Sequence, residues 1–224
     1  MLQQMRRRMV AAAWLAALAS TACGTTMRQT LQGGVGSGAA GSGPRTPAEQ
    51  AKADGGVMPY TRADVEFMQG MIGHHAQAVV MAGWAPAHGA RSDVRTLAGR
   101  IDVAQRDEIA FMQRWLRDRH ELAPDASAQH EMDGHQMSGM KMMPGMLTPA
   151  QMAQLSAATG TEFDRLFLTY MIQHHQGAIA MVEALYASQG SGQDLYIFRF
   201  ASDVNADQAT EIDRMRTMLP APPL

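Results

Sequence analysis

The fold is decided by a stretch that occurs twice in the chain, as residues 71–81 (MIGHHAQAVVM) and as residues 171–181 (MIQHHQGAIAM). In each copy, a methionine is followed three and four residues later by a pair of histidines. Residues at steps of three and four share one face of an α-helix, and the apolar residues of each copy follow this spacing. The stretch therefore predicts two equivalent helices, and an internal repeat of this kind sets the architecture.

The repeat extends on both sides of this stretch. Upstream, Asp64 and Phe67 match Asp164 and Phe167. Downstream, a second helical pattern recurs, in which Gln105, Glu108, Ile109, Met112 and Leu116 match Gln208, Glu211, Ile212, Met215 and Leu219. No stretch alternates with a period of two for long enough to predict a sheet. We therefore expect an all-α protein, most simply a four-helix bundle built from two repeated helical hairpins.

Local signals indicate where the helices and domains begin and end. Thr61 with Asp64 has the pattern of a capping box, and Pro86 with Gly89 indicates a helix end. Further candidates are helix starts at Ser92 and at Ser191 or Gln193, and a stop at Pro220. These signals predict a first hairpin over 58–120, a Met/His-rich linker over 121–147 and a second hairpin over 148–224.

The N-terminal residues 1–22 have the features of a signal peptide. Three arginines precede an apolar run over 10–19 that is too short to span a bilayer. The single cysteine, Cys23, stands where a bacterial lipoprotein is cleaved and acylated, although residues 20–22 also suit ordinary signal cleavage. Residues 23–57 are rich in glycine and serine, which predicts a flexible tether. We therefore expect an exported envelope protein, either lipid-anchored at the outer face of the membrane through Cys23 or periplasmic.

The composition excludes several classes of function. The formal charge of the 224 residues is −2, and removal of the three signal arginines leaves −5. Nucleic-acid binding needs a basic face, so no nucleic-acid partner is expected. One cysteine excludes a disulfide framework and a cysteine-rich zinc site. Methionine is in excess, with 20 residues against 6 phenylalanines, and this excess needs an explanation.

The histidine pairs are the first candidate metal ligands. A single histidine on an apolar helix face is usually a core residue, but here two pairs recur at matching positions. Each pair shares a helix face with the methionine before it, and imidazole together with thioether favours copper, the thioether especially Cu(I). The candidate ligands are His74, His75, His174, His175, Met71 and Met171.

The same pairs have a structural interpretation, in which they fix helix packing through hydrogen bonds. The two interpretations are compatible, because metal-bound histidines usually donate their other ring N–H to an acceptor. Candidate acceptors or additional ligands are Glu108, Glu211, Gln105, Gln208, Met112, Met215, Asp64 and Asp164.

The predicted linker holds a second group of candidate ligands. Residues 130–146 contain six methionines and two histidines, interrupted by glycine, proline, serine and charged residues. Because this pattern cannot form the apolar stripe of a helix, we interpret it as a site of soft-metal capture. The alternative is an adaptable surface that docks a partner protein. The candidate ligands are His130, His135, Met132, Met137, Met140, Met142 and Met143.

Together these motifs resemble the exported, ferritin-like helical proteins of the family called domain of unknown function 305. The resemblance covers about 61–119 and 148–219 and rests on both histidine-pair motifs and on the Gln/Glu-Ile-x-x-Met tails. Gly73 and Gln173 depart from the residues that usually precede the pairs. Some members of this family are periplasmic proteins that bind copper and take part in copper resistance. The resemblance therefore implies a ferritin-like fold and metal binding at Met71, His74, His75, Met171, His174 and His175.

No enzymatic role is expected. A di-iron site needs Glu-x-x-His motifs on helices, a blue-copper site needs a cysteine thiolate, and the sequence has no nucleophile-elbow motif. We predict an envelope protein that binds Cu(I) or Cu(II), other divalent metals being open, for copper buffering, resistance or delivery to an unidentified partner. The alternatives are a structural or interaction module and a metal-dependent redox enzyme. Copper affinity is expected to fall below about pH 6 as imidazoles become protonated.

Overall fold

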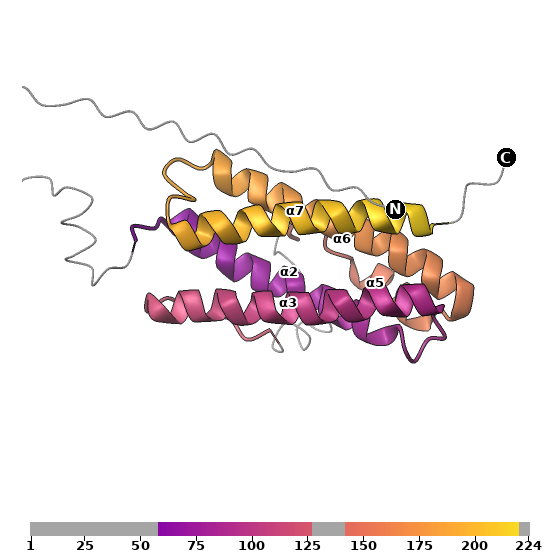
Figure 1. The fold of residues 1–224 in the computed structure, drawn as a ribbon. Helices are drawn as coiled ribbons and strands as arrows, with labels where there is room; N and C mark the ends of the chain where they lie inside the picture. Colours follow the sequence, from indigo (N-terminus) through magenta and orange to yellow (C-terminus); the bar gives the residue numbers. More distant parts are fainter. Residues whose placement is uncertain (1–57, 127–141, 220–224) are drawn as a thin grey trace, which may run out of the picture. The chain divides into compact units, whose positions relative to one another are not determined.

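The computed structural model describes residues 58–126 and 142–219. In these ranges the regular elements are all helices: α2 (Arg62–Trp84), α3 (Ser92–Asp118), α5 (Pro149–Ala157), α6 (Gly160–Ala187) and α7 (Leu195–Met218). The four long helices form two hairpins, α2–α3 and α6–α7, and α2 packs against α6 (Figure 1). The prediction of an all-α fold with two helical hairpins is confirmed.

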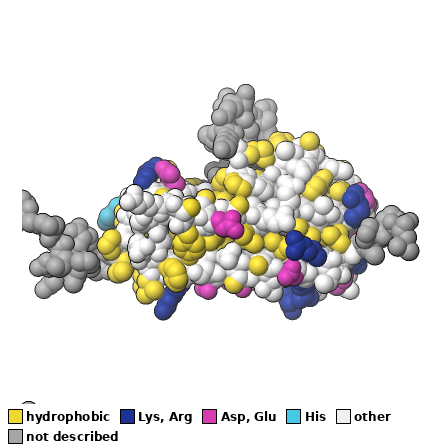
Figure 2. Space-filling model, turned by 90° about the horizontal axis from the view of Figure 1, so that it is seen from above, with side chains coloured by type: hydrophobic (Ala, Val, Ile, Leu, Met, Phe, Trp, Pro, Cys, Tyr) yellow, Lys and Arg dark blue, Asp and Glu magenta, His cyan; other side chains and the backbone are white. Residues whose placement is uncertain are grey.

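Several predictions concern residues outside the described ranges. These are the signal peptide over 1–22, the tether over 23–57 with Cys23, and the linker residues His130, Met132, His135, Met137 and Met140. The division of the chain into signal, tether, hairpins and linker stays a prediction. Among the described helices, none has the length and hydropathy needed to cross a bilayer. Figure 2 shows charged side chains of both signs dispersed over one face, with hydrophobic side chains visible between them.

The helix starts agree with the sequence signals in part. Thr61 and Asp64 form the predicted capping box of α2. Helix α3 begins at Ser92 as expected, with Arg91 as its N-cap. The predicted start of the last helix at Ser191 or Gln193 is wrong, because α7 is capped by Asp194, whose Oδ1 accepts from two backbone N–H groups. The Ser191 hydroxyl instead donates to carbonyls at the end of α6.

The short helix α5 is an addition to the two helices expected in this unit. Its start is stabilised by a capping box in which Gln151 N donates to Thr148 Oγ1 (3.2 Å) and Thr148 N donates to Gln151 Oε1 (2.9 Å). Pro149 follows, at a position where its missing N–H costs nothing. The side chain of Leu155 is buried in the core and packs α5 against it.

The core consists of two apolar clusters at opposite ends of the paired hairpins. One cluster contains residues from the end of α2, the start of α3, the start of α6 and the end of α7. The other contains residues from the remaining half of each of these helices. The histidine pairs lie between the two clusters in sequence on both α2 and α6. The core therefore leaves a polar level between its apolar halves.

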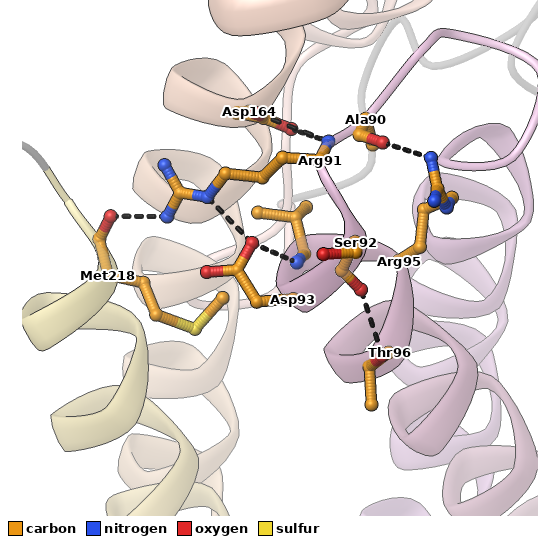
Figure 3. A network of polar contacts seen from close by, with 9 residues as sticks. Ala90, Arg91, Ser92, Asp93, Arg95, Thr96, Asp164 and Met218 are labelled. Atoms are coloured by element: carbon orange, nitrogen blue, oxygen red, sulfur yellow. Dashed lines mark hydrogen bonds and ion pairs between the residues drawn. The ribbon is translucent and has the colours of Figure 1, made fainter.

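In each hairpin, a buried aspartate accepts a hydrogen bond from the backbone of the turn in the other hairpin. Asp64 Oδ2 accepts from Thr61 N (2.8 Å), and its Oδ1 accepts from Gly192 N (2.8 Å) in the α6–α7 turn. Asp164 of α6 accepts from Arg91 N at 3.2 and 3.4 Å, in the α2–α3 turn (Figure 3). The two aspartates, matched in the sequence repeat, therefore make reciprocal contacts between the hairpins.

Replacing Asp64 should weaken both the capping box and the contact between hairpins. We expect Asp64→Ala to lower the free energy of unfolding by about 2 kcal/mol, since it removes an N-terminal cap and a charged hydrogen-bond acceptor. Urea unfolding at neutral pH measures the change. Glu66→Ala is the matched control, because Glu66 lies on the same helix in an exposed ion pair with Arg62, which is worth less than about 1 kcal/mol. Equal losses in the two variants would contradict this role of Asp64.

Candidate metal centre

Four fully buried histidines form one layer of the core, here called the histidine layer. His74 and His75 come from α2, and His174 and His175 come from α6. The ring centroids of His74 and His174 are 3.8 Å apart. Within each pair the centroids are farther apart, 6.4 Å in α2 and 6.3 Å in α6. The structure thus brings together both histidine pairs that the sequence singles out.

The two histidines of a pair face different neighbours because adjacent helical residues point about 100° apart. His74 and His174 meet where α2 packs against α6. His75 turns toward α3, where its Nε2 lies 2.7 Å from Glu108 Oε2. His175 turns toward α7, where its Nε2 donates to Glu211 Oε2 at 2.6 Å. The contact of His75 has the distance of an ion pair but lacks hydrogen-bond alignment.

Glu108 and Glu211 connect the buried layer to solvent. Their side chains retain 23% and 25% of their surface exposed, whereas the histidines they contact have none. The structure therefore places these two glutamates where the sequence expects acceptors for the histidine pairs. Gln105 and Gln208, the other expected acceptors, are buried with the amide oxygen of each unpaired.

Residues 142–147, here called the strap, lie over one side of the layer. The carbonyl oxygen of Pro144 accepts from His74 Nε2 (3.0 Å). The side-chain amide of Gln77 makes two hydrogen bonds with the backbone of Leu147, at 2.7 and 3.1 Å. Beneath the strap lies Gly177 of α6, where an added Cβ would be 2.0 Å from Pro144 O. The strap is therefore held by α2 and lies directly on the backbone of α6.

The histidine layer contains ring nitrogens that have no hydrogen-bond partner. The carbonyl of Pro144 can only accept, so His74 carries its proton on Nε2 and its Nδ1 is left with a free lone pair. The Nδ1 atoms of all four histidines are buried and unpaired, as are Nε2 of His75 and Nε2 of His174. An unpaired buried polar group costs about 1–3 kcal/mol. Such a concentration of unpaired imidazole nitrogens fits a ligand that accepts lone pairs, which a metal ion does.

Burial keeps the central imidazoles neutral. Desolvation, and then the neighbouring His75, lowers the pKa of His74 from 6.5 to about 3. Desolvation, and then His74, lowers the pKa of His174 well below 6.5. In the folded protein these two rings therefore remain unprotonated below pH 6. The expectation that copper affinity falls below about pH 6 stays a prediction, but in the metal-free protein burial lowers the pKa of His74 and His174 below this range, which the sequence does not reveal.

The candidate ligands other than histidine are carboxylates and thioethers, and only thioethers lie close in sequence to the histidine layer. Within 58–126 and 142–219, no three His, Cys, Asp or Glu side chains converge closely enough to hold an ion. A shell of three or more ligands therefore needs a thioether or a movement of the rings. Met71 and Met171 are fully buried one turn before the histidines. They are consequently the thioethers nearest to the layer in sequence.

The structure does not place Asp64 and Asp164 beside the histidine layer. Each lies ten residues before the first histidine of its helix, which is about 15 Å along the axis. Their carboxylate oxygens accept from backbone N–H groups of the turns. Met112 and Met215 are fully buried members of opposite apolar clusters.

Of the linker candidates, Met142 and Met143 fall within the described residues. Both are partly buried. The sulfur of Met143 lies over Gly70, where an added Cβ would be 3.3 Å from it. Gly70 is one turn before His74 on α2, so the strap brings a linker thioether to the same side of this helix.

Three residues beside the layer were missed by sequence reasoning. Pro144 contributes a backbone carbonyl, which no side-chain pattern indicates. Gln77 and Gly177 occupy matching positions of the repeat but are different residues. This difference is one of several between residues 71–81 and 171–181, so it gave no specific signal that the two helices have different neighbours at this level.

The fold and the layer define a class of helical protein in which two repeated hairpins bury two histidine pairs between apolar clusters. The chain belongs to the family described as domain of unknown function (DUF305), whose profile matches residues 64–219. The predicted family membership is therefore confirmed. No curated protein sequence matches the chain significantly.

Solved structures similar to this chain include proteins described as DUF305 and a copper-bound protein. A putative secreted protein DUF305 from Streptomyces coelicolor is 28% identical, with a TM-score of 0.57 over 70% of this chain and 91% of that chain. A DUF305 fragment from Deinococcus radiodurans is 29% identical, with a TM-score of 0.57 over 71% and 97%. CopM in the Cu(II)-bound form is 27% identical, with a TM-score of 0.55 over 69% and 94%.

Proposed function

We propose that this chain is a copper-binding protein whose metal site is the histidine layer. The observation that carries the proposal is the set of four buried Nδ1 atoms without a hydrogen-bond partner. Copper is the metal favoured by imidazole and thioether donors together, with Cu(I) preferring the thioether and Cu(II) the imidazole. The similarity to CopM, a protein crystallised with Cu(II), supports the same choice of metal.

In this proposal the neighbours of the layer orient the ligands. Glu211 accepts from Nε2 of His175, and the Pro144 carbonyl accepts from Nε2 of His74. Glu108 lies beside Nε2 of His75 without hydrogen-bond alignment, so that nitrogen is not occupied by an acceptor. Acceptors of this kind leave Nδ1 as the ligand atom and increase its basicity. Met71 and Met171 supply thioethers where Cu(I) is bound. The remaining linker residues, His130 to Met143, capture copper before it reaches the layer.

We further propose that the protein acts outside the cytoplasm and binds copper without chemical turnover. Residues 1–22 would direct export, and Cys23 would carry a lipid that anchors the tether to the membrane. The description of the Streptomyces coelicolor structure as a putative secreted protein supports export. Buffering, resistance or delivery of copper to a partner all follow from reversible binding at such a site.

A competition titration with Cu(I) and Cu(II) tests the proposed site. In the chain without its signal, we expect His74→Gln with His174→Gln to weaken the tightest copper binding on the order of 100-fold or more, since two ligands are lost. His120→Asn is the control, because His120 is exposed and has a positive φ, which asparagine tolerates. Circular dichroism confirms that each variant is folded.

The same titration separates this proposal from its alternatives. If the double variant binds copper as tightly as the parent, the layer is a packing feature and the linker alone holds the metal. If the parent binds no copper, a structural or interaction role replaces metal binding. Turnover of a redox dye by the copper-loaded protein would instead support an enzyme.

A further inference from the structure

A groove between α3 and α7 lies outside the carboxylates that contact the histidine layer. Its volume is about 400 Å³, and its lining comprises Asp107, Glu108, Phe111, Tyr196, Arg199, Phe200, Asp203 and Asp207. Four of these residues are acidic and one is basic. In Figure 1, α3 and α7 are the two helices in front, with α2 and α6 behind them.

The aromatic residues give the groove a fixed apolar wall. Phe111 of α3 and Phe200 of α7 are stacked, with ring centroids 5.1 Å apart. Phe200 also meets Phe67 of α2 edge to face, at 6.4 Å. The groove is therefore a defined space between helices that contact each other, and its acidic side chains are held on either side of it.

The residues that line the groove carry more negative than positive charge. The pKa of Asp207 is raised by partial burial and then by the charges of Glu108, Asp203 and Glu211. Arg199 is the one basic residue of the lining. Carboxylates that repel one another in a partly desolvated space attract a cation strongly, because low-dielectric walls focus the field.

One residue of the groove lining, Glu108, also contacts the buried histidine layer. Glu108 lines the groove, and its Oε2 lies 2.7 Å from Nε2 of His75. His75 is fully buried, and this nitrogen has no hydrogen-bond partner. A buried, unpaired nitrogen therefore faces a carboxylate that is itself in contact with solvent.

We infer that the groove between α3 and α7 is the entrance through which a hydrated divalent cation reaches the histidine layer. Asp203 and Asp207 attract the cation, and Glu108 transfers it from the groove to His75. The inference rests on the proposed function, since it needs a metal site in the layer. Carboxylate oxygens favour Cu(II) over Cu(I). A divalent ion also gains twice as much as a monovalent ion from the same electrostatic potential.

Stopped-flow measurement of Cu(II) association, followed by quenching of tryptophan fluorescence in the chain without its signal, tests this inference. At low ionic strength we expect Asp203→Asn with Asp207→Asn to slow association about tenfold, and added salt to remove most of the difference. The number of Cu(II) ions bound should stay the same. Asp213→Asn is the control, because Asp213 lies on the same helix but is exposed and paired with Arg216.

A second variant should change the rate in the opposite direction. Arg199→Gln removes the one cation of the groove, so we expect faster Cu(II) association at low ionic strength, a result that structural damage would not produce. Association rates that match the parent in both groove variants would overturn the inference while leaving the proposed function intact. Absence of Cu(II) binding to the parent would overturn the proposed function, and this inference with it.

Discussion

Acidification from pH 7.5 to pH 5 should destabilise the metal-free protein by about 4 kcal/mol. In the unfolded chain, His74 and His174 take up protons as the pH falls through 6.5. In the folded protein the pKa of His74 is lowered to about 3, and that of His174 is also far below 6.5. The unfolded state therefore binds more protons below pH 6.5, and stability falls with pH. Each histidine contributes about 1.4 kcal/mol per pH unit in this window.

Urea unfolding at a series of pH values measures this effect. The loss should begin near pH 6.5 and continue toward pH 3, where His74 becomes protonated in the folded protein as well. His74→Gln with His174→Gln should remove most of the slope, whereas the exposed His120→Asn should retain it. If the double variant has the same slope as the parent, the acid sensitivity originates in other groups.

In the proposed copper-binding function, this pH dependence changes how acid would release the metal. Because the two central rings stay neutral in the folded state, mild acid does not compete for them directly. It favours the unfolded chain, whose histidines are protonated. Copper would therefore be released through unfolding or opening of the core, a cooperative process, and bound copper would oppose it by stabilising the folded state.

Gly177→Ala should displace the strap and cost about 3 kcal/mol or more. The new Cβ would lie 2.0 Å from Pro144 O and 2.5 Å from Gly145 Cα. Both contacts are with backbone, so a side-chain rotation cannot relieve them. Overpacking of this kind costs about 1–3 kcal/mol, and displacement of the strap also breaks the hydrogen bonds between Gln77 and Leu147.

Gly83→Ala is the matched control for this substitution. Gly83 is also a helical glycine, on α2, and nothing lies within 4 Å of an added Cβ. It should gain up to about 1 kcal/mol from helix propensity. Amide hydrogen exchange at Leu147, whose N–H donates to Gln77 Oε1, should become faster in Gly177→Ala alone. Unchanged stability and unchanged protection of Leu147 would show that the strap does not depend on Gly177.

The sequence predicts those features of the fold that follow from the helical period and from the internal repeat. The 3.6-residue spacing specifies the long helices, and the matching of residues 71–81 with 171–181 places two histidine pairs at equivalent levels. The complete burial of both pairs is not predicted, because it depends on how the neighbouring helices and the strap pack around them. Asp64 and Asp164 were also recognised as equivalent, but their contacts were not, since their partners are backbone N–H groups that carry no side-chain signal.

The strap makes a contact with the histidine layer that the sequence does not predict. Its methionines predict a segment that captures soft metals, but the contact with His74 is made by the Pro144 carbonyl. Such a contact depends on how closely the backbone can approach α6, and therefore on Gly177. The short helix α5 was missed for a related reason. Its nine residues are too few for a convincing period, although its capping box is visible in the sequence.

The reciprocal contacts of Asp64 and Asp164 have a consequence for the symmetry of the site. Two hairpins that each hold the turn of the other have the geometry of an isologous dimer, in which both halves use the same surface. A true dimer of identical hairpins would have to place the same backbone over both central histidines or over neither. Joining the halves in one chain removes this restriction, so His74 can have the Pro144 carbonyl as its partner while Nε2 of His174 has none. A nearly symmetric scaffold thereby holds two chemically distinct imidazoles next to each other.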